Sequence, residues 1–149
     1  MIDDKVIEDY FIEVRDYLLT KENKVKFNLT RNQCNEIEAG VYCFFVDNKL
    51  KYIGESGCLK KRINDLLNTK NHTFRRSLGE LYFSSDKLYT KASSTSNYHS
   101  DIEKLLEEKM KKHLSFSYIP MKIGRKEFEE WFQEHHTEIE FLNKRKKRK

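Results

Sequence analysis

Two short runs of β-branched and aromatic residues constrain the fold of this chain more than any other feature. They occupy positions 40–47 (Gly-Val-Tyr-Cys-Phe-Phe-Val-Asp) and 50–54 (Leu-Lys-Tyr-Ile-Gly), with Asp-Asn-Lys at 47–49. β-Branched and aromatic residues favour β-strands, and the polar triplet at 47–49 is typical of a tight turn. The sequence therefore predicts an antiparallel hairpin at this point of the chain.

The length of the hairpin turn decides where two tyrosines of these strands point. A turn of three residues would pair Phe44 with Tyr52 and bring Tyr42 and Tyr52 to one face of the sheet. A turn of two residues would place them on opposite faces, because side chains alternate along a strand. In the first case two phenol hydroxyls lie together beside a basic helix, where they could address a phosphate.

The spacing of apolar residues predicts the remaining elements. Helices are expected over 2–19, 57–68, 72–81, 101–113 and 126–136, a strand over 114–121, and a short strand is possible in the alternating run 24–30. This order predicts an α+β domain with a small, mostly antiparallel, three-stranded sheet. The hairpin and the later strand form the sheet, helices flank it, and an extra helix precedes it. We expect an N-terminal extension at 1–37, a main domain at 38–143 and a basic, disordered tail at 144–149.

The composition narrows the class of protein. A length of 149 residues suits one domain, and although only 38% of the residues are hydrophobic, the 13% that are aromatic can fill a compact core. No apolar run reaches the ~20 residues of a membrane span, and the first residues lack the order of a secretory signal. The three cysteines show no CxxC spacing, which argues against a disulfide framework or a zinc site. We expect a soluble cytoplasmic protein.

Basic side chains are concentrated in two parts of the chain. Residues 39–99 hold ten basic and five acidic side chains, and every residue of 144–149 is Lys or Arg. The segments 1–38 and 100–143 each carry a net charge of −3. Basic patches attract polyanions, and the internal one coincides with the hairpin and the helix after it. The charge distribution therefore favours a polyanionic partner.

Short motifs in this region resemble those of a known family. Gly-Val-Tyr at 40–42, Tyr-Ile-Gly at 52–54 and Arg62 are similar to the GIY-YIG nuclease domain. Phe-Glu-Glu-Trp-Phe at 128–132 resembles a later helix of that family, and Leu-Asn at 142–143 its terminal hydrophobic-Asn pair. The resemblance covers the main domain. It implies a small α+β nuclease that cuts DNA phosphodiester bonds with one divalent metal.

The resemblance implies a role for each matching residue. Tyr42 would be the general base, with Tyr52 assisting, if nearby cations favour its phenolate. Arg62 would bind the phosphate through its planar, permanently charged guanidinium. Glu129 would hold Mg²⁺ or Mn²⁺, because a hard cation accepts one carboxylate together with water and phosphate oxygens. Glu130 is an alternative to Glu129 on the same helix.

The sequence also departs from the family pattern. Leu66 stands where the family often has a Tyr or His one turn after the arginine, and His72, further along, is the candidate for that catalytic place. The usual proline before the terminal Asn is absent. The residues expected to contact DNA are Lys60, Lys61, Arg75, Arg76, Asn143, Lys144 and Arg145.

Two other functions compete with a DNA endonuclease. A catalytically silent module of the same fold would hold nucleic acid through the basic segment and tail, but the retained Tyr42, Tyr52, Arg62 and glutamate argue against it. A scaffold protein without a nucleic-acid role is the second alternative. It is kept open by the net charge of −1 that remains when the tail is excluded, since a nucleic-acid surface is usually more basic.

Overall fold

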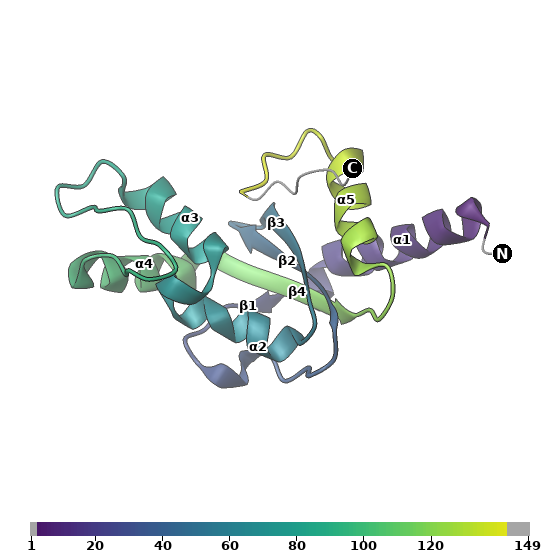
Figure 1. The fold of residues 1–149 in the computed structure, drawn as a ribbon, viewed down its shortest axis with the longest axis horizontal. Helices are drawn as coiled ribbons and strands as arrows, with labels where there is room; N and C mark the ends of the chain where they lie inside the picture. The colour runs from purple at the N-terminus through teal and green to yellow at the C-terminus, as the bar shows by residue number, and fades with distance from the viewer. Residues whose placement is uncertain (1–2, 143–149) are drawn as a thin grey trace.

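The structure, a computed structural model, describes residues 3–142 and contains helices on both sides of a central sheet (Figure 1). The helices are α1 (Asp4–Leu19), α2 (Leu59–Asn64), α3 (Thr73–Phe83), α4 (Ser100–His113) and α5 (Arg125–His135). The strands are β1 (Val25–Lys26), β2 (Gly40–Val46), β3 (Lys49–Ser56) and β4 (Leu114–Pro120). Within residues 3–142, no helix is both long and apolar enough to cross a membrane.

The sheet is antiparallel throughout, with the strand order β1-β4-β2-β3. It has four strands where the sequence predicted three, so the fold class is confirmed and the strand count is corrected. The additional strand, β1, comes from the alternating run 24–30, of which only two residues join the ladder. Shortly after these residues, the side-chain oxygen of Gln33 accepts from the backbone N–H of Asn28 at 3.0 Å.

The hairpin turn has two residues. Asp47 and Asn48 both have positive φ, of 51° and 65°, and the flanking Val46 and Lys49 pair directly. Positive φ at both central positions is typical of a type I′ turn, and Asn and Asp tolerate this backbone conformation better than most residues. By alternation alone, such a turn would separate the two tyrosines.

A β-bulge on β3 reverses that outcome. The register shifts by one residue at Lys51, so that Phe44 pairs with Tyr52 as it would after a three-residue turn. Tyr42 and Tyr52 therefore share one face, while Leu50 packs on the other face. The carbonyl of Lys51 accepts from the backbone N–H of Leu142 at 2.7 Å, which ties the C-terminal segment to the bulge.

Each face of the sheet carries its own hydrophobic core. Phe44 and Phe116 belong to the core that α2, α3 and α4 cover, and Val41 and Phe45 belong to the core under α1 and α5. The residues before β2 thus take part in the packed unit, since α1 covers one face and β1 extends the sheet. The two tyrosines lie on the α2–α3 face.

Candidate active site

Two stacked phenols form the floor of the candidate site. Tyr42 on β2 is 1% exposed, Tyr52 on β3 is also buried, and their ring centroids lie 6.0 Å apart with an interplanar angle of 17°. Gly54 is the cross-strand partner of Tyr42. A Cβ atom at Gly54 would lie 2.5 Å from both Cζ and Oη of Tyr42. The glycine therefore leaves the space that the phenol occupies.

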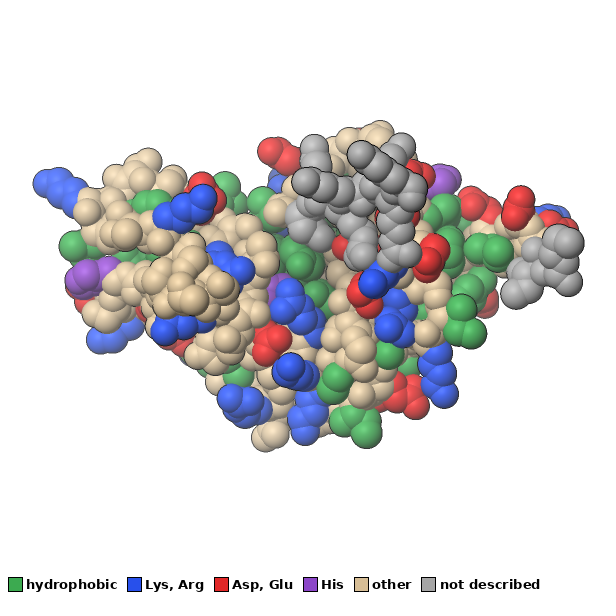
Figure 2. Space-filling view, in the orientation of Figure 1, with side chains coloured by type: hydrophobic (Ala, Val, Ile, Leu, Met, Phe, Trp, Pro, Cys, Tyr) green, Lys and Arg blue, Asp and Glu red, His purple; other side chains and the backbone are tan. Residues whose placement is uncertain are grey.

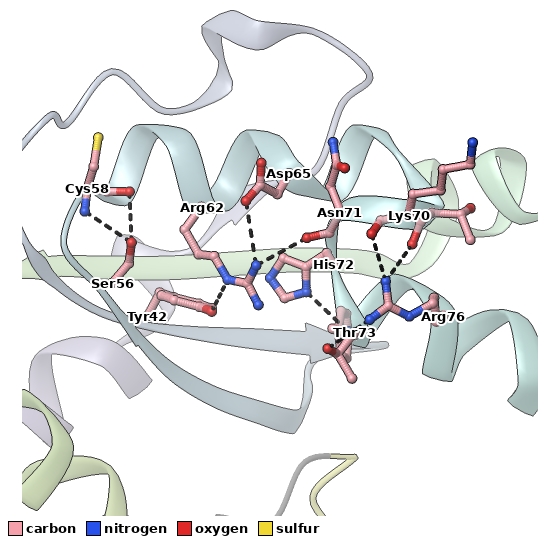
Figure 3. Close-up of polar contacts among 12 residues, drawn as sticks. Tyr42, Ser56, Cys58, Arg62, Asp65, Lys70, Asn71, His72, Thr73 and Arg76 are labelled. Carbon is pink, nitrogen blue, oxygen red and sulfur yellow. Dashed lines mark hydrogen bonds and ion pairs between the residues drawn. The ribbon is translucent and has the colours of Figure 1, made fainter. Parts of the chain in front are cut away.

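Arg62 on α2 lies beside the phenol of Tyr42 (Figure 3). Its Nε donates to the hydroxyl oxygen of Tyr42 at 3.2 Å, and its Nη1 donates to the backbone carbonyl of Asn71 at 3.2 Å. The carboxylate of Asp65 lies 3.5 Å from the same Nη1. With its side chain 28% exposed, the guanidinium connects the buried phenols to the surface.

Sequence reasoning missed the two groups that hold Arg62 in place. Asp65 stands three positions after the arginine, a spacing at which side chains meet on a helix, so it could have been found from the sequence. The other group is the backbone carbonyl of Asn71, and because every residue has such a carbonyl, the sequence gives no sign of this contact.

His72 is brought against both phenols. Its ring is 0% exposed and meets the rings of Tyr42 and Tyr52 edge to face, with centroids 6.3 and 5.6 Å apart. Nδ1 accepts from the backbone N–H of Phe74 at 3.1 Å, so His72 caps α3. Burial, reinforced by the charges of Arg62 and Arg76, holds the pKa of His72 well below its usual range.

The neutral imidazole of His72 has one defined tautomer. Because Nδ1 accepts a hydrogen bond, the proton is on Nε2. This Nε2 is buried and has no hydrogen-bond partner among residues 3–142. The site therefore contains a neutral N–H donor next to two phenols, although the catalytic role assigned to His72 is still a prediction.

Burial also controls the ionisation of the phenols. It raises the pKa of Tyr42 well above its ordinary value, the neighbouring Tyr52 raises it further, and Arg62 only partly opposes the shift. The pKa of Tyr52 is also raised, first by burial, while Arg62 lowers it. Both phenols are thus protonated at neutral pH. Arg62 alone does not supply the cationic surroundings that a phenolate base needs.

Glu129 comes from the helix that packs on the other face of the sheet and contacts β3. It lies on α5, is 5% exposed, and its charge adds to the raised pKa of Tyr52. Glu130, the alternative, is half-buried. In the described part of the chain, no three His, Cys, Asp or Glu side chains cluster as a metal-binding group. A single carboxylate is enough for a hard divalent cation, which completes its coordination with water and substrate oxygens.

Two of the basic residues expected to contact DNA line a groove next to Arg62. Lys60 and Lys61 are exposed and border a space of about 330 Å³ that Asp65 and Asn71 also line. Lys and Arg side chains gather over α2 on this face of the molecule (Figure 2). Arg76 is half-buried, and its Nη1 donates to two backbone carbonyls of residues 69–70.

Arg75 lies inside the protein instead of at its surface. It is 3% exposed, its Nη2 donates to Glu103 at 2.9 Å, and its Nη1 donates to the carbonyl of Leu66 at 2.9 Å. Its Nε donates to the hydroxyl of Thr69 at 3.0 Å. A guanidinium held on three sides and shielded from solvent braces α3 against α4, so we withdraw Arg75 from the expected DNA contacts. Asn143, Lys144, Arg145 and the rest of the basic tail lie outside the described residues.

Comparison with known protein families agrees with this arrangement. The GIY-YIG catalytic domain matches residues 17–148, which is most of the chain. The protein therefore belongs to the GIY-YIG family of nuclease domains. No curated protein matches the chain, and no solved structure matches it.

Proposed function

We propose that this protein is an endonuclease that hydrolyses DNA phosphodiester bonds with the help of one divalent metal ion. The observation that carries the proposal is the hydrogen bond from Arg62 to the buried hydroxyl of Tyr42, with Tyr52 stacked on the same face. Family membership supports the same reaction, since GIY-YIG nuclease domains act on DNA. Phosphodiester hydrolysis needs a phosphate ligand, a proton acceptor and a stabiliser of negative charge.

Arg62 is the proposed phosphate ligand. Its guanidinium is partly exposed and already oriented by Asp65 and the Asn71 carbonyl. Planar, permanently charged donors of this kind bind phosphate oxygens strongly. Positioning before the reaction matters, because a pre-oriented donor loses little free energy to reorganisation as negative charge develops.

Glu129 is the proposed metal ligand. A bound Mg²⁺ or Mn²⁺ would act as a Lewis acid on the phosphate and add positive charge beside the phenols. Glu129 is 5% exposed and its charge raises the pKa of Tyr52, and both observations support its choice as the metal ligand.

Tyr42 is the proposed proton acceptor, acting through its hydroxyl oxygen. Because burial keeps this phenol protonated at neutral pH, it must lose its proton before it can take one from the attacking water. Additional positive charge at the site would favour that ionisation. His72, with its proton on Nε2, can donate a hydrogen bond to an oxygen that enters the site.

Cleavage of supercoiled and branched DNA by the purified protein tests the proposal. We expect cleavage with Mg²⁺ or Mn²⁺ and none with EDTA. Arg62→Ala and Glu129→Gln should each slow the reaction by about 10²–10³-fold, the loss seen when one electrostatic stabiliser is removed. Glu130→Gln, one position along the same helix, is the matched control and should have a mild effect.

The outcomes separate the competing functions. DNA binding without cleavage under any of these conditions would favour the catalytically silent module. Full activity of Glu129→Gln together with an inactive Glu130→Gln would move the metal ligand by one residue. Full activity of both variants would overturn the metal assignment.

A further inference from the structure

A second positively charged groove lies at the turn end of the hairpin, away from the phenols. It has a volume of about 350 Å³ and runs between β1, the β2–β3 turn and the junction of α4 with β4. The residues that matter for its chemistry are Lys21, Lys24, Lys26, Lys112, Asn48 and Ser115. We call this surface the lysine groove.

The sheet holds part of the lysine groove in a defined geometry. Lys26 on β1 pairs with Ser115 on β4, which in turn pairs with Phe45 on β2, so the three side chains form one row across the sheet. Lys24 lies two positions before Lys26 and points to the same side of the strand. Its Nζ lies 4.0 Å from the centroid of the Phe45 ring, a cation–π contact.

The positive charge of the groove is not neutralised within residues 3–142. Among the residues that the structure describes, none of the four ammonium groups has a carboxylate oxygen within 4 Å. Asp47, the acidic residue of the groove, instead contacts Nδ1 of His113 at 2.5 Å. Lys112 lies in the last turn of α4, where the helix dipole favours a positive charge. The end of α4 does not explain Lys24 and Lys26, which lie at β1. Four like charges around one hollow repel one another, and an anionic ligand would relieve that repulsion.

A hydroxyl in the groove also lacks a partner. The oxygen of Ser115 is shielded from water and makes no hydrogen bond within the described residues. Buried polar atoms are nearly always hydrogen-bonded, because an unpaired one costs free energy. A small rearrangement that admits a phosphate oxygen would satisfy this hydroxyl together with the lysines.

We propose that the lysine groove binds the phosphate backbone of DNA at a point remote from the cleaved bond; this inference rests on the proposed nuclease function. Ammonium groups on flexible stems suit a regular row of phosphates, and duplex DNA carries one charge per ~1.7 Å of its axis. Tyr42 lies on the opposite face of the sheet and three residues, or roughly 10 Å, along β2 from Phe45. One nucleotide cannot reach both places, so the groove contacts a flanking part of the substrate.

Salt-dependent binding of a fluorescein-labelled 20-base-pair duplex, followed by anisotropy in EDTA, tests the groove without cleavage. In the triple variant Lys24→Gln/Lys26→Gln/Lys112→Gln, each lost phosphate contact should lower the slope of log K against log salt by about 0.9. We expect a total decrease of about 2–3 and weaker binding at low salt. The control Lys87→Gln/Lys91→Gln/Lys104→Gln removes three exposed lysines outside the groove and should change the slope by less than 1.

A titration of the wild-type protein followed by amide NMR makes the test independent of any variant. DNA should shift the amide signals of Asn48 and Ser115, and a poly-glutamate peptide of equal charge should shift them less. Equal slopes for the two triple variants, unchanged signals, or a preference for poly-glutamate would overturn the proposal. A protein that never cleaves DNA, but whose slope falls in the groove variant, would refute the nuclease function and support the groove.

Discussion

Replacing Gly54 by alanine tests whether the position of the Tyr42 hydroxyl controls activity. The added Cβ would lie 2.5 Å from Cζ and Oη of Tyr42, where ordinary contacts begin near 3.4 Å. The ring has little room to turn aside, because it is buried against Phe44, Tyr52 and His72, with centroids 5.0, 6.0 and 6.3 Å away. Either the phenol or strand β3 must move by about 1 Å.

The size of this shift sets the expected effects. Overpacking of a core costs about 1–3 kcal/mol of the free energy of unfolding, and each kcal/mol lowers the Tm of a protein of this size by roughly 2–4 °C. The bond from Arg62 Nε to Tyr42 Oη is already 3.2 Å long, at the upper end for N–H···O bonds. A further 1 Å would break it. Misplacement of catalytic groups by this distance can cost about 10²-fold in rate.

Initial rates of plasmid nicking at saturating DNA, together with thermal unfolding, measure both effects. Gly57→Ala is the control, because a Cβ atom there meets nothing within 4 Å. We expect the control to keep the rate and Tm of the wild-type protein. Gly54→Ala should have a lower rate and a lower Tm. If the two variants behaved alike, the close approach of Gly54 to Tyr42 would have no functional consequence. A lower Tm with an unchanged rate would show that catalysis does not need the contact between Tyr42 and Arg62.

Three further predictions concern ionisation and buried charge. Because the pKa of Tyr42 is raised, its phenolate fraction grows with pH, so the cleavage rate should rise by up to tenfold per pH unit between about pH 7 and 9; a slope retained by Tyr42→Phe would exclude this phenol as the base. The pKa of His72 is lowered in the folded state, so the unfolded chain binds the extra proton and stability falls as the pH drops below about 6.5, by up to ~1.4 kcal/mol per unit. In His72→Asn, which keeps a capping side chain, the part of the stability loss that comes from His72 should disappear. Urea unfolding at pH 7.5 and at pH 5.5 measures the difference in stability for both proteins. Arg75→Met should cost about 3–5 kcal/mol of the free energy of unfolding in the same assay, since it leaves the partly buried Glu103 without its cationic partner, and a near-neutral effect would refute the bracing role.

Short-range patterns in the sequence were sufficient for most of the architecture. The spacing of apolar residues predicted the five α-helices of residues 3–142, and β-branched and aromatic runs on either side of a polar turn predicted the hairpin. The order of the tyrosines, Arg62 and the later glutamate helix was enough to identify the family. Each of these signals depends on residues close together in the chain or on the order of short motifs, so it survives without knowledge of the tertiary structure.

The details of the site depended on contacts between distant segments. The two-residue turn alone would have separated Tyr42 from Tyr52, and the bulge at Lys51, whose carbonyl binds the C-terminal segment, restored their common face. Neither the bulge at Lys51 nor the hydrogen bond that its carbonyl accepts from Leu142 has a local sequence signature.

Burial distinguished residues that look alike in the sequence. Arg75 and Arg76 are adjacent, yet Arg75 is enclosed because Glu103, 28 positions later, lies beside it, whereas Arg76 is half-buried. The sequence by itself determined the fold class and the family. Only the tertiary structure decided which arginine is structural, which histidine nitrogen holds the proton, and where unpaired lysines gather. Burial, pKa and local charge are set by neighbours in space, and those neighbours come from distant parts of the chain.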